Sequence, residues 1–388
     1  MPDQTQPNDD TPARRRPLPD EAAVGQDTVF ITNNNVVERY ASLYQALMQM
    51  DAAAEETGAG VDMKKITKDE ELLFRRLLGR DADEQRYEIR RQFAHGGMGV
   101  LYCVFDRDLR RQSVMKVLLP DAKHDSALVR TFIREARITG QLEHPNIVPV
   151  HDLGRLDDEG IYFTMKQVQG ESLNSIISML ELGKKEYARQ YDLFSLLSIF
   201  RKVCDAVAYA HSSGIIHRDI KPHNVMVGNF GEVFLMDWGL AKYVGDVTTE
   251  IYLGEDELED AAGCGGHAVV LKGSPGYMSP EQAGFRGGEL DERSDIFLLG
   301  GTLYHMLSFF PPYVGATIEE ILDAARNCDH LDLAGMPLSC AHVPEALLDV
   351  VRHCMAAEKS ERYNSVLDLI KDLDDLIHGR VDTRHQVY

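Results

Sequence analysis

Residues 215–224 read IIHRDIKPHN and place an acid, a base and an amide within six positions of one another. Asp219 could accept a proton from a hydroxyl group, Lys221 could contact a phosphoryl oxygen, and Asn224 could bind a divalent metal through its amide oxygen. Pro222 disfavours a regular helix, so a loop is expected. A polar loop between a helix and a strand could carry the same residue types without a catalytic role. The pattern therefore raises phosphoryl transfer as a hypothesis.

A lysine in a strand-like stretch could serve the same chemistry. Lys116 lies within the apolar segment 113–119, where an unpaired ammonium group is costly. Glu135 follows nineteen residues later in a predicted helix, so the two side chains could meet. An edge lysine that reaches solvent would give the same pattern, and both interpretations stay open here.

Hydrophobic periodicity predicts the elements that position these residues. Alternating or apolar runs bounded by turn residues predict strands at 87–93, 100–105, 113–119, 161–168, 225–227 and 233–236. Apolar residues at three- and four-residue spacing predict helices at 126–141, 193–212, 291–308, 318–326, 344–356 and 363–376. Ser126 is the expected N-cap of the first of these helices. The chain is therefore predicted to form a small antiparallel sheet followed by a helical region.

The N-terminal part has a different character. Residues 1–27 are rich in Pro, Asp and Gln and are predicted to be a disordered tail. Residues 28–86 form a predicted helical extension, with two amphipathic segments that each begin with a capping-box pattern. Two short helices cannot form a core alone, so they should dock on the following domain or dimerise. Docking is favoured because one apolar stripe more often covers a neighbour in its own chain.

Composition excludes several classes of function. The formal net charge of −21 argues against binding of a nucleic-acid backbone and fits basic partners or substrates better. The six cysteines are far apart and contain no C-x-x-C pair, which favours reduced thiols in a cytoplasmic protein over disulfides or zinc. No apolar run approaches the roughly 18 residues of a membrane span. The chain is expected to be soluble.

The motifs, taken in order, resemble those of bacterial eukaryotic-type (Hanks-type) serine/threonine protein kinases. The HRDIKPHN segment resembles the catalytic loop of that family. Residues 94–101 resemble its Gly-rich loop, with Ala94 at the first glycine and Leu101 at the valine. Residues 237–239 resemble the D-F-G metal motif with Trp238 for Phe, and residues 272–281 resemble the end of the activation segment with Ser279 for Ala.

The resemblance implies an α+β, two-lobed protein kinase fold, with a small antiparallel β-sheet N-lobe carrying one regulatory helix and a larger helical C-lobe. The N-lobe would occupy residues 87–168, the C-lobe 169–380, and a tail 381–388. It also implies transfer of the ATP γ-phosphoryl group to protein serine or threonine hydroxyls, with Mg²⁺ as cofactor.

Residue roles are implied by the same resemblance. Asp219 would orient the hydroxyl and Lys221 the transferring group, Lys116 would pair with Glu135, and Mg²⁺ would be held by Asn224 and Asp237. The nucleotide would be bound by Lys116 and by residues of the Gly-rich loop, the sheet and the hinge, namely Gly96, Gly97, Gly99, Leu101, Val114, Met165, Lys166 and Val168. Structural roles would fall to Trp238, Asp295 and a Glu281–Arg362 pair.

Regulation is expected at the activation segment. Arg218 and Lys242 can face an acidic loop, where a phosphate on Thr248 or Thr249 would create a charged partner for them. Ser274 is a further candidate regulatory residue. A homodimer remains possible. The same fold could also serve a pseudokinase that only binds nucleotide or scaffolds partners, or a plain interaction module built on the N-terminal helices.

Overall fold

The computed structural model describes residues 86–95, 99–119, 125–156, 160–245, 273–284, 290–333 and 343–379 of the 388-residue chain. Several predictions concern residues outside these segments: the tail 1–27, the helical extension up to residue 85, Gly96, Gly97, Thr248, Thr249 and the tail 381–388.

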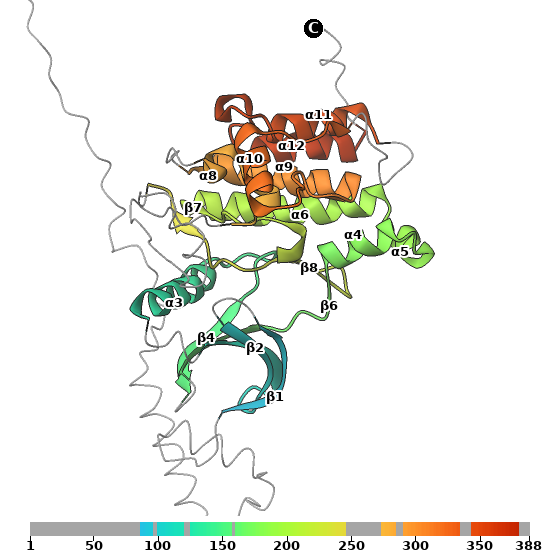
Figure 1. Ribbon diagram of the computed structural model, residues 1–388. Coiled ribbons are helices and arrows are strands. Elements are labelled where there is room, and N and C mark those ends of the chain that lie inside the picture. The colour runs from blue at the N-terminus through green and yellow to red at the C-terminus, as the bar shows by residue number, and fades with distance from the viewer. Residues whose placement is uncertain are drawn as a thin grey trace, which may run out of the picture. The chain divides into compact units, whose positions relative to one another are not determined.

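The first lobe is built on an antiparallel sheet of five strands in the order β1-β2-β3-β5-β4, with helix α3 (Ser126–Gln141) beside it (Figure 1). The strands are β1 (Tyr87–His95), β2 (Gly99–Asp106), β3 (Arg111–Leu118), β4 (Val150–Leu156) and β5 (Gly160–Lys166). The predicted α+β fold with a small antiparallel sheet is confirmed. Strand β4 was not predicted, because none of its side chains is fully buried and its hydrophobic pattern is correspondingly weak.

Strand β3 determines the face of the sheet on which the Lys116 side chain lies. Val114 packs into the apolar cluster between the sheet and α3, whereas Met115 and Val117 pack into a second cluster on the opposite face. Side chains alternate between the two faces of a strand, so Lys116 is directed to the same side as Val114, toward α3.

The start of α3 differs from the prediction. Asp125, not Ser126, is the N-cap, because its carboxylate accepts hydrogen bonds from the amides of Ala127 and Leu128 at 2.7 and 3.3 Å. Ser126 is the first residue inside the helix. Both residue types cap helices well, and the carboxylate also suits the positive end of the helix dipole. The prediction that Ser126 caps the helix is therefore wrong by one position.

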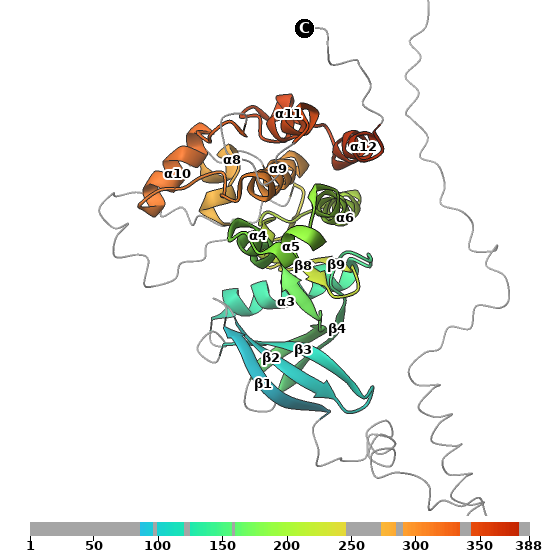
Figure 2. The ribbon, with the colours of Figure 1, turned by 90° about the vertical axis from the view of Figure 1, so that its right-hand side faces the viewer.

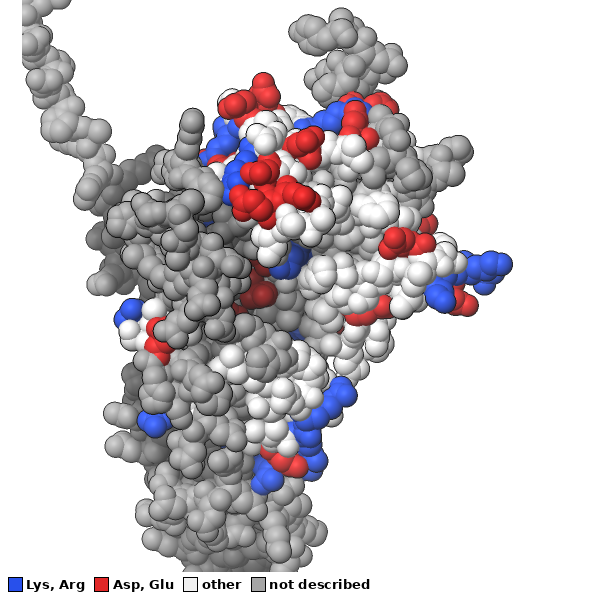
Figure 3. All heavy atoms as spheres, in the orientation of Figure 1, with Lys and Arg blue, Asp and Glu red and all other residues white. Residues whose placement is uncertain are grey.

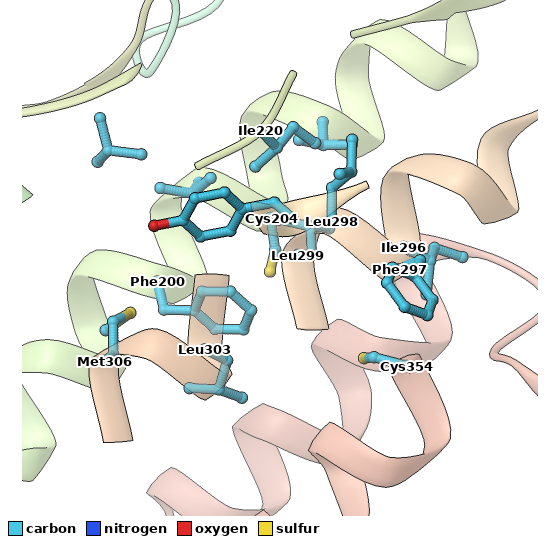
Figure 4. Packing of buried hydrophobic residues seen from close by; sticks show 14 of the residues in the cluster. Phe200, Cys204, Ile220, Ile296, Phe297, Leu298, Leu299, Leu303, Met306 and Cys354 are labelled. Carbon is cyan, nitrogen blue, oxygen red and sulfur yellow. The ribbon is translucent and has the colours of Figure 1, made fainter. Parts of the chain in front are cut away.

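The second lobe is helical. Its helices are α4 (Leu173–Glu181), α5 (Lys185–Gln190), α6 (Leu193–Ser212), α8 (Pro280–Ala283), α9 (Glu292–Ser308), α10 (Ile318–Asn327), α11 (Glu345–Cys354) and α12 (Val366–Ile377). Helices α6 and α9 lie at the centre, and Figure 4 shows Phe200 and Cys204 of α6 facing Leu299 and Leu303 of α9 within the main core. Nearly all of α9 is buried, so its acidic residue Asp295 is also inside the protein.

Short strands between the lobes position the segments that contain Asp219 and Asp237. Strands β6 (Gly170–Ser172), β8 (Val225–Gly228) and β9 (Val233–Leu235) form a three-stranded sheet, and β7 (Ile215–Ile216) pairs with β10 (Lys242–Tyr243). Figure 2 shows β8 and β9 between the first lobe and α6. The loop between β7 and β8 is residues 217–224, and the segment after β9 contains Asp237. A hydrogen bond also joins the two lobes directly. The side chain of Asn146 donates to the carbonyl of Val233 at 2.9 Å.

Candidate active site

A buried carboxylate organises the loop after β7. Asp295 of α9 has no exposed surface and accepts hydrogen bonds from the amides of His217 and Arg218 at 2.7 and 2.8 Å. The side chain of His211 lies 2.8 Å from the same carboxylate. Burial alone would raise the pKa of Asp295, but these partners outweigh burial and lower it, so the group is an anion at neutral pH. Asp295 therefore holds the loop by its backbone, as expected of a structural residue facing it.

The loop brings Asp219 into a cluster of donors. Lys221 donates to Oδ2 of Asp219 at 2.7 Å, and the amide nitrogen of Asn224 donates to the same oxygen at 3.0 Å. The hydroxyl of Ser274 donates to Oδ1 at 2.8 Å and also accepts a hydrogen bond from Lys221. Ser274, expected to be regulatory, thus lies in the cluster around Asp219. A carboxylate held in this way can accept a hydrogen bond from a hydroxyl and orient it.

Lys116 and Glu135 form the expected ion pair across the face of β3. The ammonium nitrogen lies 2.6 and 2.8 Å from the two carboxylate oxygens, and the side chains are only 14% and 5% exposed. Burial alone would lower the pKa of Lys116, but the carboxylates of Glu135 and Asp237 outweigh burial and raise it. The lysine is therefore a fixed cation in this cleft.

Asn224 and Asp237 supply oxygen atoms suited to Mg²⁺. The amide nitrogen of Asn224 donates to the backbone and side chain of Asp219, which leaves its amide oxygen directed away from that residue. Asp237 has an exposed side chain and a left-handed backbone with φ of 58°. Among the described segments no group of three or more His, Cys, Asp or Glu side chains could hold a metal. One carboxylate and one amide oxygen fit Mg²⁺, which keeps waters and binds substrate phosphates as its other ligands.

Trp238 is fixed in the core beside the catalytic loop. Its side chain is 1% exposed, and its ring lies 4.5 Å from the ring of His217. The indole nitrogen donates to the carbonyl of Leu235 at 3.4 Å. The contact between Trp238 and His217 joins residues 237–239 to the loop that contains Asp219.

The apolar residues expected at the nucleotide lie together. Val114 is opposite Met165 in the sheet, and Leu101 packs against the same cluster. The side chain of Lys166 does not join these apolar residues. Its ammonium nitrogen lies 4.5 Å from the centre of the Phe234 ring in the second lobe. Any nucleotide contact at Lys166 would therefore use the backbone. Val168 is half-buried in the segment that joins the lobes. The face of the molecule seen in Figure 3 is hollowed between the lobes, with acidic and basic side chains together in the hollow.

Gly99 has a packing reason in addition to any role in the Gly-rich loop. A Cβ atom at this position would lie 2.7 Å from the carbonyl oxygen of Val117 on the neighbouring strand, too close for any L side chain. The glycine thus allows β2 and β3 to pair closely at the end of the sheet above Lys116.

Glu281 and Arg362 form a buried bidentate ion pair. The two guanidinium nitrogens lie 2.7 and 2.9 Å from the carboxylate oxygens, and the side chain of Arg362 has no exposed surface. Burial alone would raise the pKa of Glu281, but Arg362 outweighs it and lowers the pKa below its ordinary value. The pair joins α8, just after Ser274, to the C-terminal part of the lobe and so fixes one wall of the site.

The candidate regulatory residues are placed only in part. Arg218 is buried, with a left-handed φ of 71°, and Lys242 pairs with Ile216 in the β7–β10 ladder. Both lie close in sequence to the catalytic loop or the metal motif. Thr248 and Thr249 lie outside the described residues.

Sequence reasoning missed three contributors to the site. His211 bonds to Asp295, Gln282 donates to the carbonyl of Arg218 at 2.9 Å, and Arg134 donates to the carbonyl of Ala241 at 2.8 Å. Arg134 could have been noticed, because it directly precedes Glu135. The other two contacts involve helices α9 and α8, which are far from the loop in sequence, so no local pattern indicates them.

Comparison with known proteins agrees with this geometry. Residues 87–372 match the family model described as the protein kinase domain. The chain is 32% identical over 306 residues to the serine/threonine-protein kinase PknD of Protochlamydia amoebophila, and 33% identical over 301 residues to the PknD of Chlamydia caviae. Each match covers 76% of this chain, but only 30% and 31% of those relatives' lengths. In the part of the chain that the structure describes, no helix has the length and apolar character needed to span a membrane.

Proposed function

Because the chain belongs to the protein kinase family, we propose that it transfers the γ-phosphoryl group of ATP to serine and threonine hydroxyls of proteins. The proposal rests on the surroundings of the Asp219 carboxylate. This carboxylate accepts hydrogen bonds from Lys221, from Asn224 and from the hydroxyl of Ser274. The hydroxyl of Ser274, 2.8 Å from the carboxylate, supports the proposal, because an acceptor hydroxyl could make the same contact.

The chain's own residues supply positioning and charge. Lys116, held by Glu135, is the fixed cation that would bind the phosphates of ATP. Asp219 would orient the acceptor hydroxyl and take up its proton as the oxygen attacks phosphorus. Lys221 lies within hydrogen-bond distance of both Asp219 and Ser274, so it would neutralise charge on the group in transfer.

Asn224 and Asp237 are the residues that would hold Mg²⁺, because an amide oxygen and a carboxylate are ligands that suit this ion. When bound, the ion would neutralise charge on the phosphate oxygens during transfer. The combination of one amide and one carboxylate leaves room for those oxygens, as Mg²⁺ sites on nucleotides require.

The direct test is a phosphorylation assay of the full chain with Mg-ATP and a generic basic protein, followed by identification of the modified amino acid. The acidic net charge of −21 makes a basic acceptor the suitable choice. Phosphoserine or phosphothreonine is expected. Binding of ATP without transfer would instead indicate a pseudokinase, and neither binding nor transfer would indicate an interaction module.

We further propose that the kinase phosphorylates its own activation segment, at Thr248 or Thr249. The support is the position of two cations near the catalytic loop and the metal motif: Arg218 directly precedes Asp219, and Lys242 follows Gly239 by three residues. A phosphate carries about −1.5 to −2 charge at pH 7 and forms strong bonds to such cations.

We place the reaction in the cytoplasm. Cys103, Cys204, Cys328 and Cys354, the cysteines within the described segments, are free thiols, as expected for a reducing compartment with ATP. Protein substrates are the proposed partners. A homodimer is a further possibility, supported only by the amphipathic pattern of residues 28–86.

A further inference from the structure

Two hydrogen bonds join helix α3 to the residues that follow the metal motif. The guanidinium Nη2 atom of Arg134 donates to the carbonyl oxygen of Ala241 at 2.8 Å. The hydroxyl of Tyr243 donates to Oε1 of Gln141 at 2.9 Å. Arg134 directly precedes Glu135, and Gln141 is the last residue of α3. The two bonds therefore hold the C-terminal half of α3, which carries Glu135.

The other ends of these bonds are fixed in the second lobe. Ala241 is 1% exposed, and its amide donates to the carbonyl of Trp238 at 3.0 Å. Tyr243 pairs with Ile215 in the β7–β10 ladder, two residues before His217. The segment that receives the bonds from α3 is thus attached both to the metal motif and to the strand that leads into the catalytic loop.

We propose that Arg134 is a positioning residue for the reaction. Its bond to Ala241 sets the position of α3, and so of the Glu135 carboxylate, relative to the catalytic loop, and the Tyr243–Gln141 bond supports it. The inference rests on the proposed kinase function. Arg134 acts through Glu135: it holds in place the helix whose carboxylate holds Lys116, and does not itself touch the reacting groups.

The geometry of the ion pair makes this positioning necessary. The ammonium of Lys116 bonds to both oxygens of Glu135 at 2.6 and 2.8 Å, and a shift of α3 by an ångström or two would break these bonds. Hydrogen bonds from a charged donor are stronger than those between neutral groups. Losing one changes an equilibrium constant by about tenfold or more, which would shift α3 toward positions where Glu135 does not reach Lys116.

The test uses the full chain, treated with phosphatase so that phosphate on the activation segment plays no part. Steady-state kcat and KM for ATP are measured for Arg134→Met, for Arg134→Lys, and for Arg137→Met as the matched control. Arg137 is an exposed arginine of the same helix. Arg134→Met should lose about tenfold in kcat/KM, Arg134→Lys should recover part of it, and Arg137→Met should stay near wild type. Urea unfolding checks that all three variants remain folded under the assay conditions.

A double variant separates positioning from a general structural effect. Glu135→Gln should add little to Arg134→Met, because both act through the same ion pair. Tyr243→Phe should lose a few-fold in kcat/KM. Its control is Tyr191→Phe, which removes another tyrosine hydroxyl bonded to a glutamine, at 3.2 Å from Gln190, and should have no effect.

Three outcomes would overturn the inference: equal activity of Arg134→Met and Arg137→Met, full additivity with Glu135→Gln, or an effect confined to protein that retains phosphate. An effect seen only in protein that retains phosphate would show that the guanidinium of Arg134 serves to bind phosphate. If the wild-type chain transfers no phosphate, the proposed function fails, and the inference is then decided by Trp238 emission. A spectral change in Arg134→Met but not in Arg137→Met would support the link from α3 to the metal motif, and identical spectra would refute it.

Discussion

The carboxylate of Asp219 accepts a hydrogen bond from the hydroxyl of Ser274 at 2.8 Å, across 55 positions of sequence. Lys221 bonds to both residues. The cluster thus links the catalytic loop to the segment that leads into α8, and it occupies the position where an acceptor hydroxyl would meet the carboxylate. An acceptor that binds there must compete with Ser274 for the same oxygen or share the carboxylate with it.

Asp219→Asn should retain ATP binding and lose about 10²–10⁴-fold in turnover, because the amide cannot accept the hydroxyl proton. Turnover is measured with the basic protein substrate, and ATP affinity by calorimetry. Asp374→Asn is the control, since Asp374 pairs with Arg201 between α6 and α12, away from the cluster. Near wild-type transfer by Asp219→Asn would mean that the assigned mechanism is wrong.

Lys116→Met should behave differently from Asp219→Asn. It removes the buried cation that would bind the phosphates, so both the KM for ATP and kcat should be impaired. Lys202→Met is the control, because Lys202 is a lysine on α6 that donates to the carbonyl of Gly231. If Lys116→Met left the KM for ATP unchanged, a role of Lys116 in nucleotide geometry would be contradicted.

The Glu281–Arg362 pair should be among the most sensitive points for stability. Arg362→Met leaves a buried carboxylate without its partner and should lower the free energy of unfolding by about 3–5 kcal/mol. Arg352→Met should cost about 1 kcal/mol or less, because the acids that Arg352 pairs with are exposed. Urea unfolding of both variants measures the difference, and similar losses would contradict the argument.

The same pair should make stability depend on pH. The pKa of Glu281 is lowered in the folded protein from an ordinary value of 4.5, so the unfolded chain binds the proton more readily. Its stabilising contribution is therefore complete above that ordinary value and is lost as the pH falls through the lower, folded value. The stability difference between wild type and Glu281→Gln should shrink as the pH is lowered below 4.5. A constant difference down to strongly acidic pH would exclude this assignment.

Trp238 is the only tryptophan in the chain, so intrinsic fluorescence reports on the metal motif alone. Its burial against His217 predicts blue-shifted emission. Titration with Mg-ATP should change the emission as Asp237 engages the metal, and Asp237→Asn should respond weakly. Emission that stays unchanged to saturation would show that the motif is static and is not a switch.

Autophosphorylation should be detectable by mass spectrometry after incubation with Mg-ATP. Phosphate is expected at Thr248 or Thr249, because the cations Arg218 and Lys242 could bind its negative charge. Asp219→Asn protein treated in the same way should carry none. Absence of phosphate anywhere between residues 243 and 280 of active wild-type protein would refute the proposal.

Long buried elements were the part of the fold that the sequence predicted best. Helix α6 has the predicted bounds, because its buried residues recur at helical spacing throughout its length. Helix α5 was missed because it buries no side chain and so has no apolar period. Helix α4 was missed although it buries three side chains, since at nine residues it is short and follows directly on the turn and strand after the hinge.

The candidate site likewise contains contacts that the sequence indicated and contacts that it did not. The pairing of Lys116 with Glu135 was implied by the resemblance to protein kinases, since the strand and helix patterns alone left a solvent-facing lysine open. The contact of Ser274 with Asp219 could not be predicted, since it depends on the path of a segment that carries no periodicity. The bond from Arg134 to Ala241 was missed for a related reason: its acceptor is a backbone carbonyl, which no residue type marks.

Arg218 and Asp237 both have left-handed backbones, and neither is a glycine. For such residues this conformation costs about 1–2 kcal/mol each. Glycine would relieve the strain at either position, but it would remove a side chain to which the proposed metal binding or regulation assigns a role. If the proposed roles of Arg218 and Asp237 hold, selection for stability alone would favour variants with impaired function at these two positions, so stabilising substitutions are better sought in the helical core.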